Sequence, residues 1–230
     1  VLMSPAETLD RLAGDVLDLS AIEAGRSRLK PSPVDLGQLV ESIADQMRST
    51  VEAKGLALKV ETGAMPDTPV LLDPVRLQQV LGNLLANAVK FTEQGAITVS
   101  VRPSVSEGAA DTRAVIVVED TGRGLGAADT EALFERFHRG DGGGLAPPGL
   151  GLGLTIARTL TEAMGGRLRA EHREVGSAFI IELPLVPAEA STSLADTDQH
   201  DAGTRQDTAK GLRILVADDN DANRHLLLLI

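Results

Sequence analysis

The sequence predicts an α+β fold, a two-layer sandwich in which a mixed sheet of about five strands packs under about three helices, with a further helix at the N-terminus. Residues 114–118 (Ala-Val-Ile-Val-Val) form a continuous apolar run rich in β-branched side chains, which is typical of a buried strand. Residues 74–90 instead carry apolar side chains at helical spacing. Helices are expected at 35–53, 74–90 and 152–165, and strands at 56–61, 96–103, 114–119, 167–173 and 178–184.

The helix at 74–90 has two different faces. The apolar face would bury the helix against the sheet and consists of Leu77, Val80, Leu81, Leu84, Leu85 and Ala88. Asn83, Asn87 and Lys90 are spaced four and three residues apart, so they share one polar face and project toward one ligand. An amide oxygen suits Mg²⁺, which also binds phosphate oxygens, and a lysine adds a positive charge for phosphate. This face is therefore suited to a magnesium nucleotide.

The strand at 114–119 is followed by an aspartate and a glycine turn. Asp120 precedes Gly122 and Gly124, which let the backbone turn tightly. A carboxylate placed there can accept a hydrogen bond from an exocyclic amine such as adenine N6. An ordinary turn with a capping aspartate is the structural alternative.

A loop rich in glycine and proline occupies 139–153, just before the helix at 152–165. Such a loop is suited to a lid, and the N-terminal amides of the following helix can meet phosphates. Two familiar glycine motifs are excluded: there is no Gly-Lys-Ser/Thr of a P-loop, and Gly149, Gly151 and Gly153 do not follow a strand, as a dinucleotide fold requires. Each motif alone could be a plain cap, turn or loop. Together, in this order, they predict a nucleotide site.

Four stretches of the sequence resemble the nucleotide-binding motifs of one family. Residues 73–92 resemble the asparagine box of bacterial sensor histidine kinases, 120–124 the first glycine box, 134–139 the phenylalanine box and 149–154 the second glycine box. The chain thus resembles the catalytic ATP-binding domain of a hybrid sensor histidine kinase, in the superfamily that includes DNA gyrase, heat-shock chaperones and mismatch-repair ATPases. This resemblance implies such a domain at 33–187, with a flexible ATP lid and with ATP and Mg²⁺ as its cofactors.

The resemblance also implies roles for single residues. Asn87 is the expected Mg²⁺ ligand, Asp120 the residue that reads adenine and Lys90 a phosphate contact. Ser177 lies in a stretch that resembles the family's closing strand and is expected near the adenine. The other implied nucleotide-binding residues are Gly122, Gly124, Gly149, Gly151, Gly153 and Leu154. The expected catalytic set is Asn83, Lys90, Arg136 and Arg139, although a solvated helix end explains the two arginines equally well.

Position 83 separates the kinases from the hydrolysing members of the superfamily. The hydrolysing ATPases resemble one another in placing a glutamate four residues before the metal-binding asparagine, where it can act as general base toward water. This chain has Asn83 at that position, and an amide accepts no proton at neutral pH. The sequence therefore favours phosphoryl transfer to another group over rapid hydrolysis to water, and thus a kinase over an ATP-driven clamp. An ATPase clamp and a non-catalytic nucleotide-binding scaffold stay as alternatives.

The flanking segments predict a hybrid architecture. Residues 1–27 resemble the end of a dimerisation helix, 188–210 have the composition of a flexible linker, and 211–230 resemble the start of a receiver domain. In that receiver segment Asp218 and Asp219 would help to hold Mg²⁺. The apolar stripe within 5–24 consists of Leu9, Leu12, Val16, Leu17, Leu19 and Ile22. The implied partners are the histidine-bearing dimerisation domain of a homodimer and a receiver domain.

The histidines do not match the family's phosphorylated histidine, which lies in a His-Glu or His-Asp context. They are His138, His172, His200 and His225. The chain is therefore expected to be a fragment that cannot phosphorylate itself, with the acceptor histidine and the receiver aspartate both outside it.

Composition argues against several other classes. A net charge of −11 argues against nucleic acid as a partner. No apolar run approaches the length of about 18 residues that a membrane-spanning helix needs. The absence of cysteine fits a reducing cytoplasm. The expected location is thus the cytoplasm, within a parent protein that could itself be anchored in the bacterial inner membrane.

Overall fold

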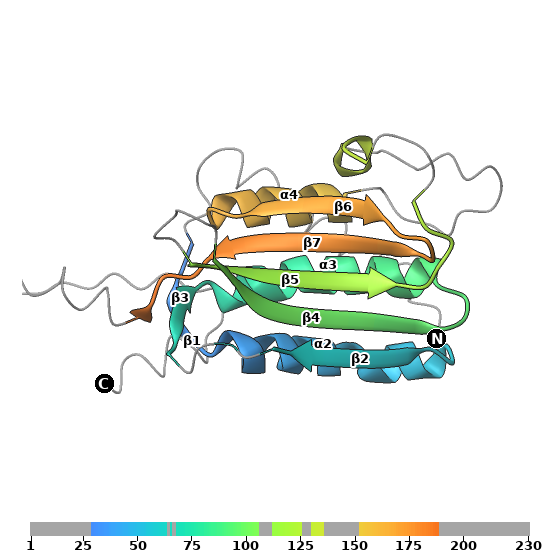
Figure 1. The fold of residues 1–230 in the computed structure, drawn as a ribbon, viewed down its shortest axis with the longest axis horizontal. Coiled ribbons are helices and arrows are strands. Elements are labelled where there is room, and N and C mark those ends of the chain that lie inside the picture. Colours follow the sequence, from blue (N-terminus) through green and yellow to red (C-terminus); the bar gives the residue numbers. More distant parts are fainter. Residues whose placement is uncertain are drawn as a thin grey trace, which may run out of the picture. The chain divides into compact units, whose positions relative to one another are not determined.

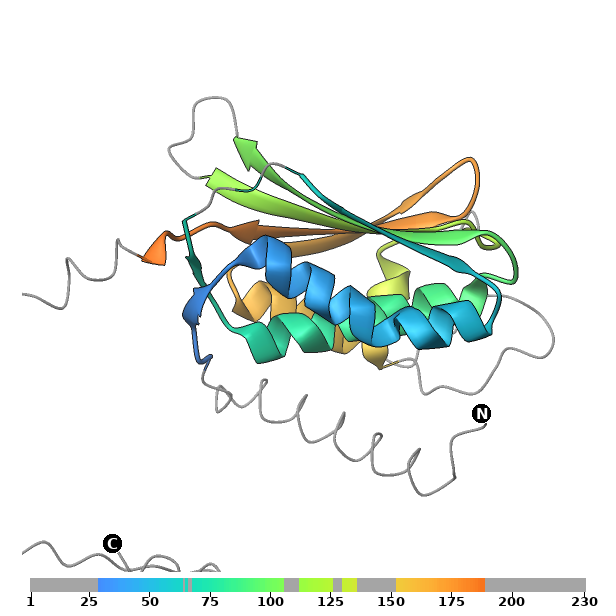
Figure 2. The ribbon, with the colours of Figure 1, turned by 90° about the horizontal axis from the view of Figure 1, so that it is seen from below.

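The computed structural model describes residues 29–63, 65, 68–105, 112–125, 130–135 and 152–188. They form a five-stranded sheet with three helices packed side by side against one of its faces (Figure 1 and Figure 2). The predicted α+β sandwich is therefore confirmed. All of these residues belong to the first of two compact units of the chain, Val1–Ser191.

Each of the first two helices begins where an aspartate caps it. The Asp35 side chain accepts a backbone N–H of the first turn of one helix at 2.9 Å. In the next helix the Asp73 side chain accepts the backbone N–H groups of Val75 and Arg76, at 3.1 Å each. Pro74 follows Asp73 at the first helical position, where no backbone N–H is needed. The helices are α2 (Leu36–Ala53), α3 (Pro74–Phe91) and α4 (Gly153–Ala163). All agree with the predicted helices apart from one or two residues at the ends.

The main sheet has the strand order β2-β4-β5-β7-β6. Its strands, all of them predicted, are β2 (Ala57–Thr62), β4 (Ala96–Val105), β5 (Thr112–Asp120), β6 (Arg167–His172) and β7 (Ser177–Pro184). β2 and β4 run parallel, while the other neighbours are antiparallel. In this order β5 is the central strand of the sheet, and Asp120 is its last residue.

Three short elements were not predicted. They are β1 (Ser32–Val34), β3 (Val70–Leu72) and the 3-10 helix η1 (Ala132–Phe134). β1 and β3 pair antiparallel as a separate two-stranded sheet, and elements this short carry no recognisable period. Their pairing brings the chain near residue 30 to the start of α3, where the Lys30 backbone N–H donates to the Asp73 side chain at 2.8 Å.

The hydrophobic core lies between the helices and the inner face of the sheet. The predicted apolar stripe of α3 is buried there, with Leu77, Leu81 and Leu84 at 0% exposure. Ile116 and Val118 of β5 meet it from the sheet. None of the helices within the described ranges is both long and apolar enough to span a membrane.

Candidate functional site

Both carboxylate oxygens of Asp120 are held in place. The residue lies at the end of β5 and is only 6% exposed. Its Oδ1 accepts the Gly122 backbone N–H at 2.8 Å, and its Oδ2 accepts the Ser177 hydroxyl. The register of β5 and β7 pairs Asp120 directly with Ser177, so the structure brings together two residues that the sequence placed near adenine. Each oxygen keeps a further lone pair for a ligand.

Glycines let the turn after β5 pack closely against its neighbours. A Cβ atom on Gly122 would overlap the Phe91 carbonyl oxygen at the end of α3, and one on Gly176 would overlap the Asp120 carbonyl oxygen. Gly124 and Gly176 also have φ angles of 72° and 80°, which favour glycine. The predicted glycine turn is therefore the place where β5, the β6–β7 hairpin and the end of α3 meet.

The polar face of α3 offers an amide oxygen and a cation. The Asn87 side chain is partly buried and makes no hydrogen bond with any other described residue, so none of these residues occupies the lone pairs of its oxygen. Lys90 lies one turn further on, with Nζ 5.1 Å from the centre of the Phe91 ring. Mg²⁺ usually takes one or two protein ligands together with water and phosphate oxygens. Asn87 as a single protein ligand, with Lys90 nearby for phosphate, agrees with this coordination preference of Mg²⁺.

Asn83, one turn before Asn87, faces the start of α4. Its Nδ2 is buried and has no hydrogen-bond partner in the part of the chain that the structure describes. A Cβ atom on Gly153 would lie 3.6 Å from its Oδ1. The structure therefore places the asparagine motif of α3 beside the end of the glycine-rich loop.

The first turn of α4 follows the glycine-rich loop in the sequence. Within the described residues no side chain caps this helix, which begins directly after Leu152. The first N–H groups of a helix lack partners inside it and sit at the positive end of its dipole. Leu154, one of the predicted nucleotide-binding residues, packs partly buried against the core. The start of α4 therefore has uncapped backbone N–H groups, and their contact with phosphate stays a prediction.

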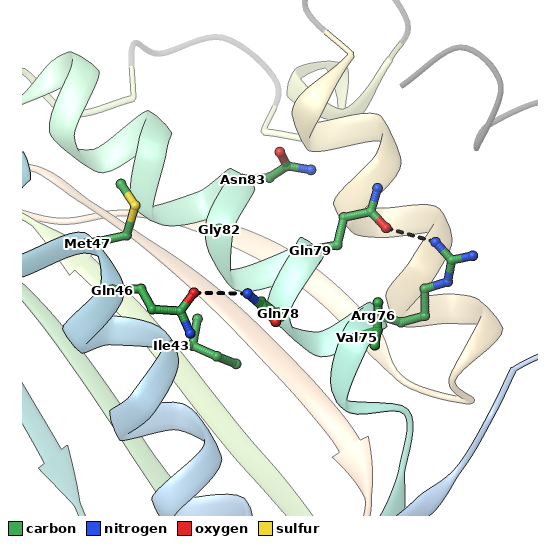
Figure 3. A pocket seen from close by; sticks show the side chains of 9 residues that line it. All are labelled: Ile43, Gln46, Met47, Val75, Arg76, Gln78, Gln79, Gly82 and Asn83. Carbon is green, nitrogen blue, oxygen red and sulfur yellow. Dashed lines mark hydrogen bonds between the residues drawn. The ribbon is translucent and has the colours of Figure 1, made fainter. Parts of the chain in front are cut away.

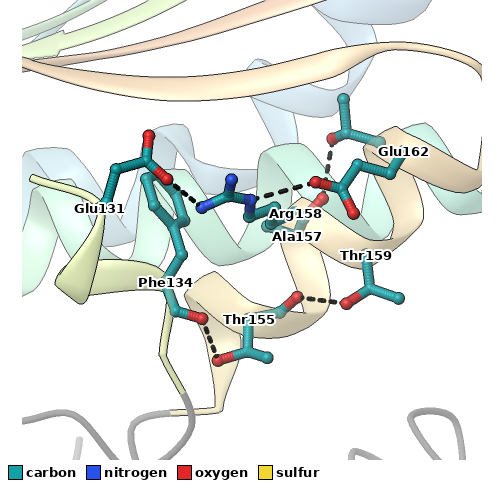
Figure 4. A network of polar contacts seen from close by, with 8 residues as sticks. Glu131, Phe134, Thr155, Ala157, Arg158, Thr159 and Glu162 are labelled. Carbon is teal, nitrogen blue, oxygen red and sulfur yellow. Dashed lines mark hydrogen bonds and ion pairs between the residues drawn. The ribbon is translucent and has the colours of Figure 1, made fainter. Parts of the chain in front are cut away.

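Phe134 fixes η1 to α4 (Figure 4). Its carbonyl oxygen accepts the Thr155 hydroxyl at 2.9 Å, and its ring lies 5.1 Å from the Arg158 guanidinium carbon. Arg158 also pairs with Glu131 at 2.7 Å and Glu162 at 3.1 Å. These hydrogen bonds, first to Glu131 and then to Glu162, raise the pKa of Arg158 above its usual value. The first residue of the predicted phenylalanine box is thus anchored on the helix that follows the glycine-rich loop.

The sequence did not identify Phe91 and Arg123 as parts of this region. The Phe91 ring is contacted by Lys90 and also by Arg123, whose guanidinium carbon is 4.8 Å from the ring centre. Such cation–π contacts hold the turn after Asp120 against the end of α3. The adjacent Lys90-Phe91 pair was a visible signal, but nothing local indicates that Arg123 approaches the same ring.

Several predicted residues lie outside the described ranges, and their roles stay predictions. They are Arg136, Arg139, Gly149, Gly151, Asp218 and Asp219. The same holds for the segments 1–27 and 211–230 and for most of the linker at 188–210.

A hollow of about 530 Å³ lies between α2 and α3 (Figure 3). Asn83 is the one predicted site residue, among those described, that lines it. The hollow is therefore a different surface from the one around Asp120.

Comparison with known proteins identifies the family of the chain. Residues 72–187, about half of the chain, match the family of histidine kinase-, DNA gyrase B-, and HSP90-like ATPases. The virulence sensor protein BvgS of Bordetella pertussis is 36% identical over 230 residues, covering 99% of this chain. The chain spans only 18% of the length of that relative.

Solved structures give the same family. Full-length ShkA in complex with AMPPNP superposes with a TM-score of 0.67 and 32% identity, over 78% of this chain and 36% of that one. The catalytic domain of histidine kinase ThkA superposes with a TM-score of 0.55 and 26% identity, over 69% of this chain and 100% of that one. The matched residues contain α3, the turn after β5 and α4, and we conclude that the chain belongs to the histidine kinase-, DNA gyrase B-, and HSP90-like ATPase family.

Proposed function

We propose that this chain carries the ATP-binding catalytic domain of a hybrid sensor histidine kinase. In this proposal the domain binds Mg·ATP and passes the γ-phosphate to a histidine on a dimerisation domain, for relay to a receiver aspartate. The observation that carries the proposal is the buried Asp120 at the end of β5, whose two carboxylate oxygens are fixed by Gly122 and Ser177. The likeness to ThkA, named a histidine kinase, and to ShkA in complex with AMPPNP supports it.

Asp120 would recognise adenine through its remaining acceptor capacity. An ionised carboxylate only accepts hydrogen bonds, which matches the adenine N6 amine and opposes the guanine carbonyl. The Gly122 and Ser177 contacts hold the carboxylate in one orientation before a ligand arrives. A preorganised acceptor loses little freedom on binding, so the same geometry favours affinity and selectivity.

The phosphates would be held by α3 and α4, away from Asp120. Asn87 would supply one oxygen ligand to Mg²⁺, Lys90 a point charge, and the first turn of α4 its free N–H groups. When bound, Mg²⁺ neutralises charge on the phosphate oxygens. Arg136 and Arg139 are the further cations that we assign to phosphate in this proposal.

Asn83 favours transfer to a protein group over hydrolysis. Phosphoryl transfer is catalysed mostly by positioning and charge neutralisation, so this domain needs no nucleophile of its own. An amide beside Gly153 cannot remove a proton from water at neutral pH. The acceptor would be a histidine of the dimerisation domain in a homodimer, with the catalytic domain in the cytoplasm. The ATPase clamp predicts steady release of phosphate instead, and a scaffold predicts no transfer at all.

Asn87→Ala tests the proposed magnesium contact. The substitution leaves the buried face of α3 unchanged, so the fold should survive while Mg²⁺-dependent ATP binding weakens by about 1–3 kcal/mol, or roughly 5- to 150-fold. Gln38→Ala, which removes an exposed amide from α2, is the control and should bind like wild type. Titration calorimetry with and without Mg²⁺ measures both. Wild-type affinity of Asn87→Ala in the presence of Mg²⁺ would refute the assignment.

A further inference from the structure

The last turn of α3 connects the residues proposed for phosphate with those proposed for adenine. Lys90 is the last residue but one of α3. The Phe91 carbonyl oxygen lies where a Cβ atom on Gly122 would overlap it, and the Phe91 ring is contacted by Arg123. Asp120 directly precedes this turn in the chain. The position of the end of α3 therefore decides how Lys90 lies relative to Asp120.

The neighbouring helix α2 ends with a cap made by its own backbone. Gly55 has a φ of 77°, and its N–H donates to the Glu52 carbonyl oxygen at 2.9 Å. The Leu56 N–H donates to the Val51 carbonyl oxygen at 3.1 Å, and both of these side chains are buried in the core. This is a Schellman motif. The end of α2 is thus satisfied without the side chain of its C-cap residue, Lys54.

Helix α3 ends in a different way and uses that side chain. Its C-cap residue Thr92 is extended, with a φ of −101° and a ψ of 120°, and the Thr92 N–H donates to the Ala88 carbonyl oxygen at 3.0 Å. The last carbonyl oxygens of a helix have no N–H partner within it. The Lys54 Nζ donates to two of them, that of Val89 at 2.5 Å and that of Lys90 at 3.4 Å. An ammonium at this end also interacts favourably with the helix dipole.

The backbone around Lys54 is itself fixed beside the end of α3. The strand β2, which follows Lys54, pairs in parallel with β4, which follows α3, and the pairing begins at Ala57 and Ala96. The Ala57 N–H also donates to the Gly95 carbonyl oxygen at 3.0 Å, in the loop between α3 and β4. The C-terminal ends of the two helices therefore lie at the same end of the domain. The ammonium reaches α3 from a preorganised position.

We propose that Lys54 is a positioning residue of the nucleotide site. By capping the last turn of α3 it holds Lys90 at the place where the phosphates of Mg·ATP bind, while Gly122 and Ser177 hold Asp120 for adenine. Lys54 acts through the backbone of α3 and touches no nucleotide. The inference rests on the proposed function, because it concerns how the same site keeps its phosphate contacts in register with its adenine contact.

Amide exchange in the complete chain tests the cap. Lys54→Met removes the ammonium, keeps an unbranched side chain and leaves the backbone cap of α2 intact. The amides of Lys90, Phe91 and Thr92 should then exchange about 3- to 10-fold faster, as expected for the loss of one hydrogen bond. Lys59→Met is the matched control, because it removes an exposed lysine from β2. It should leave these amides unchanged.

Competition of a fluorescent adenine nucleotide by Mg·ATP and by adenosine tests the effect on the site. Adenosine has no phosphate, so its binding depends on the Asp120 side, which is held without Lys54. The affinity for Mg·ATP should fall about 3- to 10-fold in Lys54→Met, while the affinity for adenosine keeps its wild-type value. Lys54→Arg retains a cationic donor and should restore the affinity for Mg·ATP. Lys59→Met should bind both ligands like the wild type.

Three outcomes would overturn the proposal. Unchanged exchange in Lys54→Met would show that the ammonium does not cap α3. Faster exchange with unchanged affinity for Mg·ATP, or with an equal loss for Mg·ATP and adenosine, would leave Lys54 with a role in the stability of the domain alone. A wild type that bound no Mg·ATP would refute the proposed function and the positioning role together, and the exchange rates would still report the cap separately.

Discussion

The substitution Asp120→Asn distinguishes a residue that reads adenine from one that only caps a turn. Asparagine keeps the size of the side chain, and its oxygen can still accept the Gly122 N–H that Asp120 accepts at 2.8 Å. Its Nδ2 then faces the Ser177 hydroxyl, which can change from donor to acceptor. The fold should therefore survive. The loss of stability should be about 1 kcal/mol, or about 2–4 °C in melting temperature for a domain of this size.

The effect on nucleotide binding should be larger and selective. A hydrogen bond to a charged group contributes about 1.5–3 kcal/mol. In the variant the carboxylate oxygen that accepts from the adenine N6 amine would be replaced by an amide N–H group, so that two donors would face each other. The expected loss in ATP affinity is therefore roughly 10- to 150-fold. Guanine has a carbonyl at the corresponding place, which Asp120 repels and asparagine can donate to. The preference for ATP over GTP should fall by at least the same factor.

Competition of a fluorescent adenine nucleotide by ATP and by GTP measures this preference, with thermal melts run in parallel. Glu119→Gln is the control, because it removes the carboxylate next to Asp120 in sequence. Glu119 is a partly exposed residue that pairs with Arg173 at 3.3 Å, and such surface pairs contribute little. An unchanged ratio of ATP to GTP affinity in Asp120→Asn, together with a lower melting temperature, would refute recognition of adenine and leave Asp120 as a turn cap.

The chain should bind Mg·ATP but take up no acid-labile phosphate from γ-labelled ATP, since its histidines do not match an acceptor; phosphohistidine formed on this chain alone would contradict this. Gly176→Ala should lower the free energy of unfolding by clearly more than about 1–2 kcal/mol, which is the strain of an alanine in the left-handed conformation. The additional loss is expected because the alanine Cβ would overlap the Asp120 carbonyl. Gly55→Ala, with a φ of 77° and no atom within 4 Å of the added Cβ, should lose only that strain. Urea unfolding compares the two, and equal losses would disprove the effect of the overlap.

The sequence determined the elements and the chemistry that each one carries. The apolar stripe of α3 is buried as predicted, because a period of 3.6 residues is a local property that fixes which side of a helix meets the core. The same periodicity placed Asn83, Asn87 and Lys90 on one face. Asp120 at the end of a β-branched run was equally visible, since the strand and the glycines after it are local signals. For these reasons the main sheet and its three helices were predicted to within a few residues.

Only the tertiary structure decided which of these pieces meet. The pairing of Asp120 with Ser177 follows from the register of β5 and β7, and the approach of Asn83 to Gly153 follows from packing of α3 beside α4. The contact of Arg123 with Phe91 and the pairing of β1 with β3 have the same origin. These contacts join residues far apart in the chain, and no periodicity of either partner encodes them. They arise because burial of the core fixes the relative positions of helices and strands, and the side chains at their ends are brought together as a consequence.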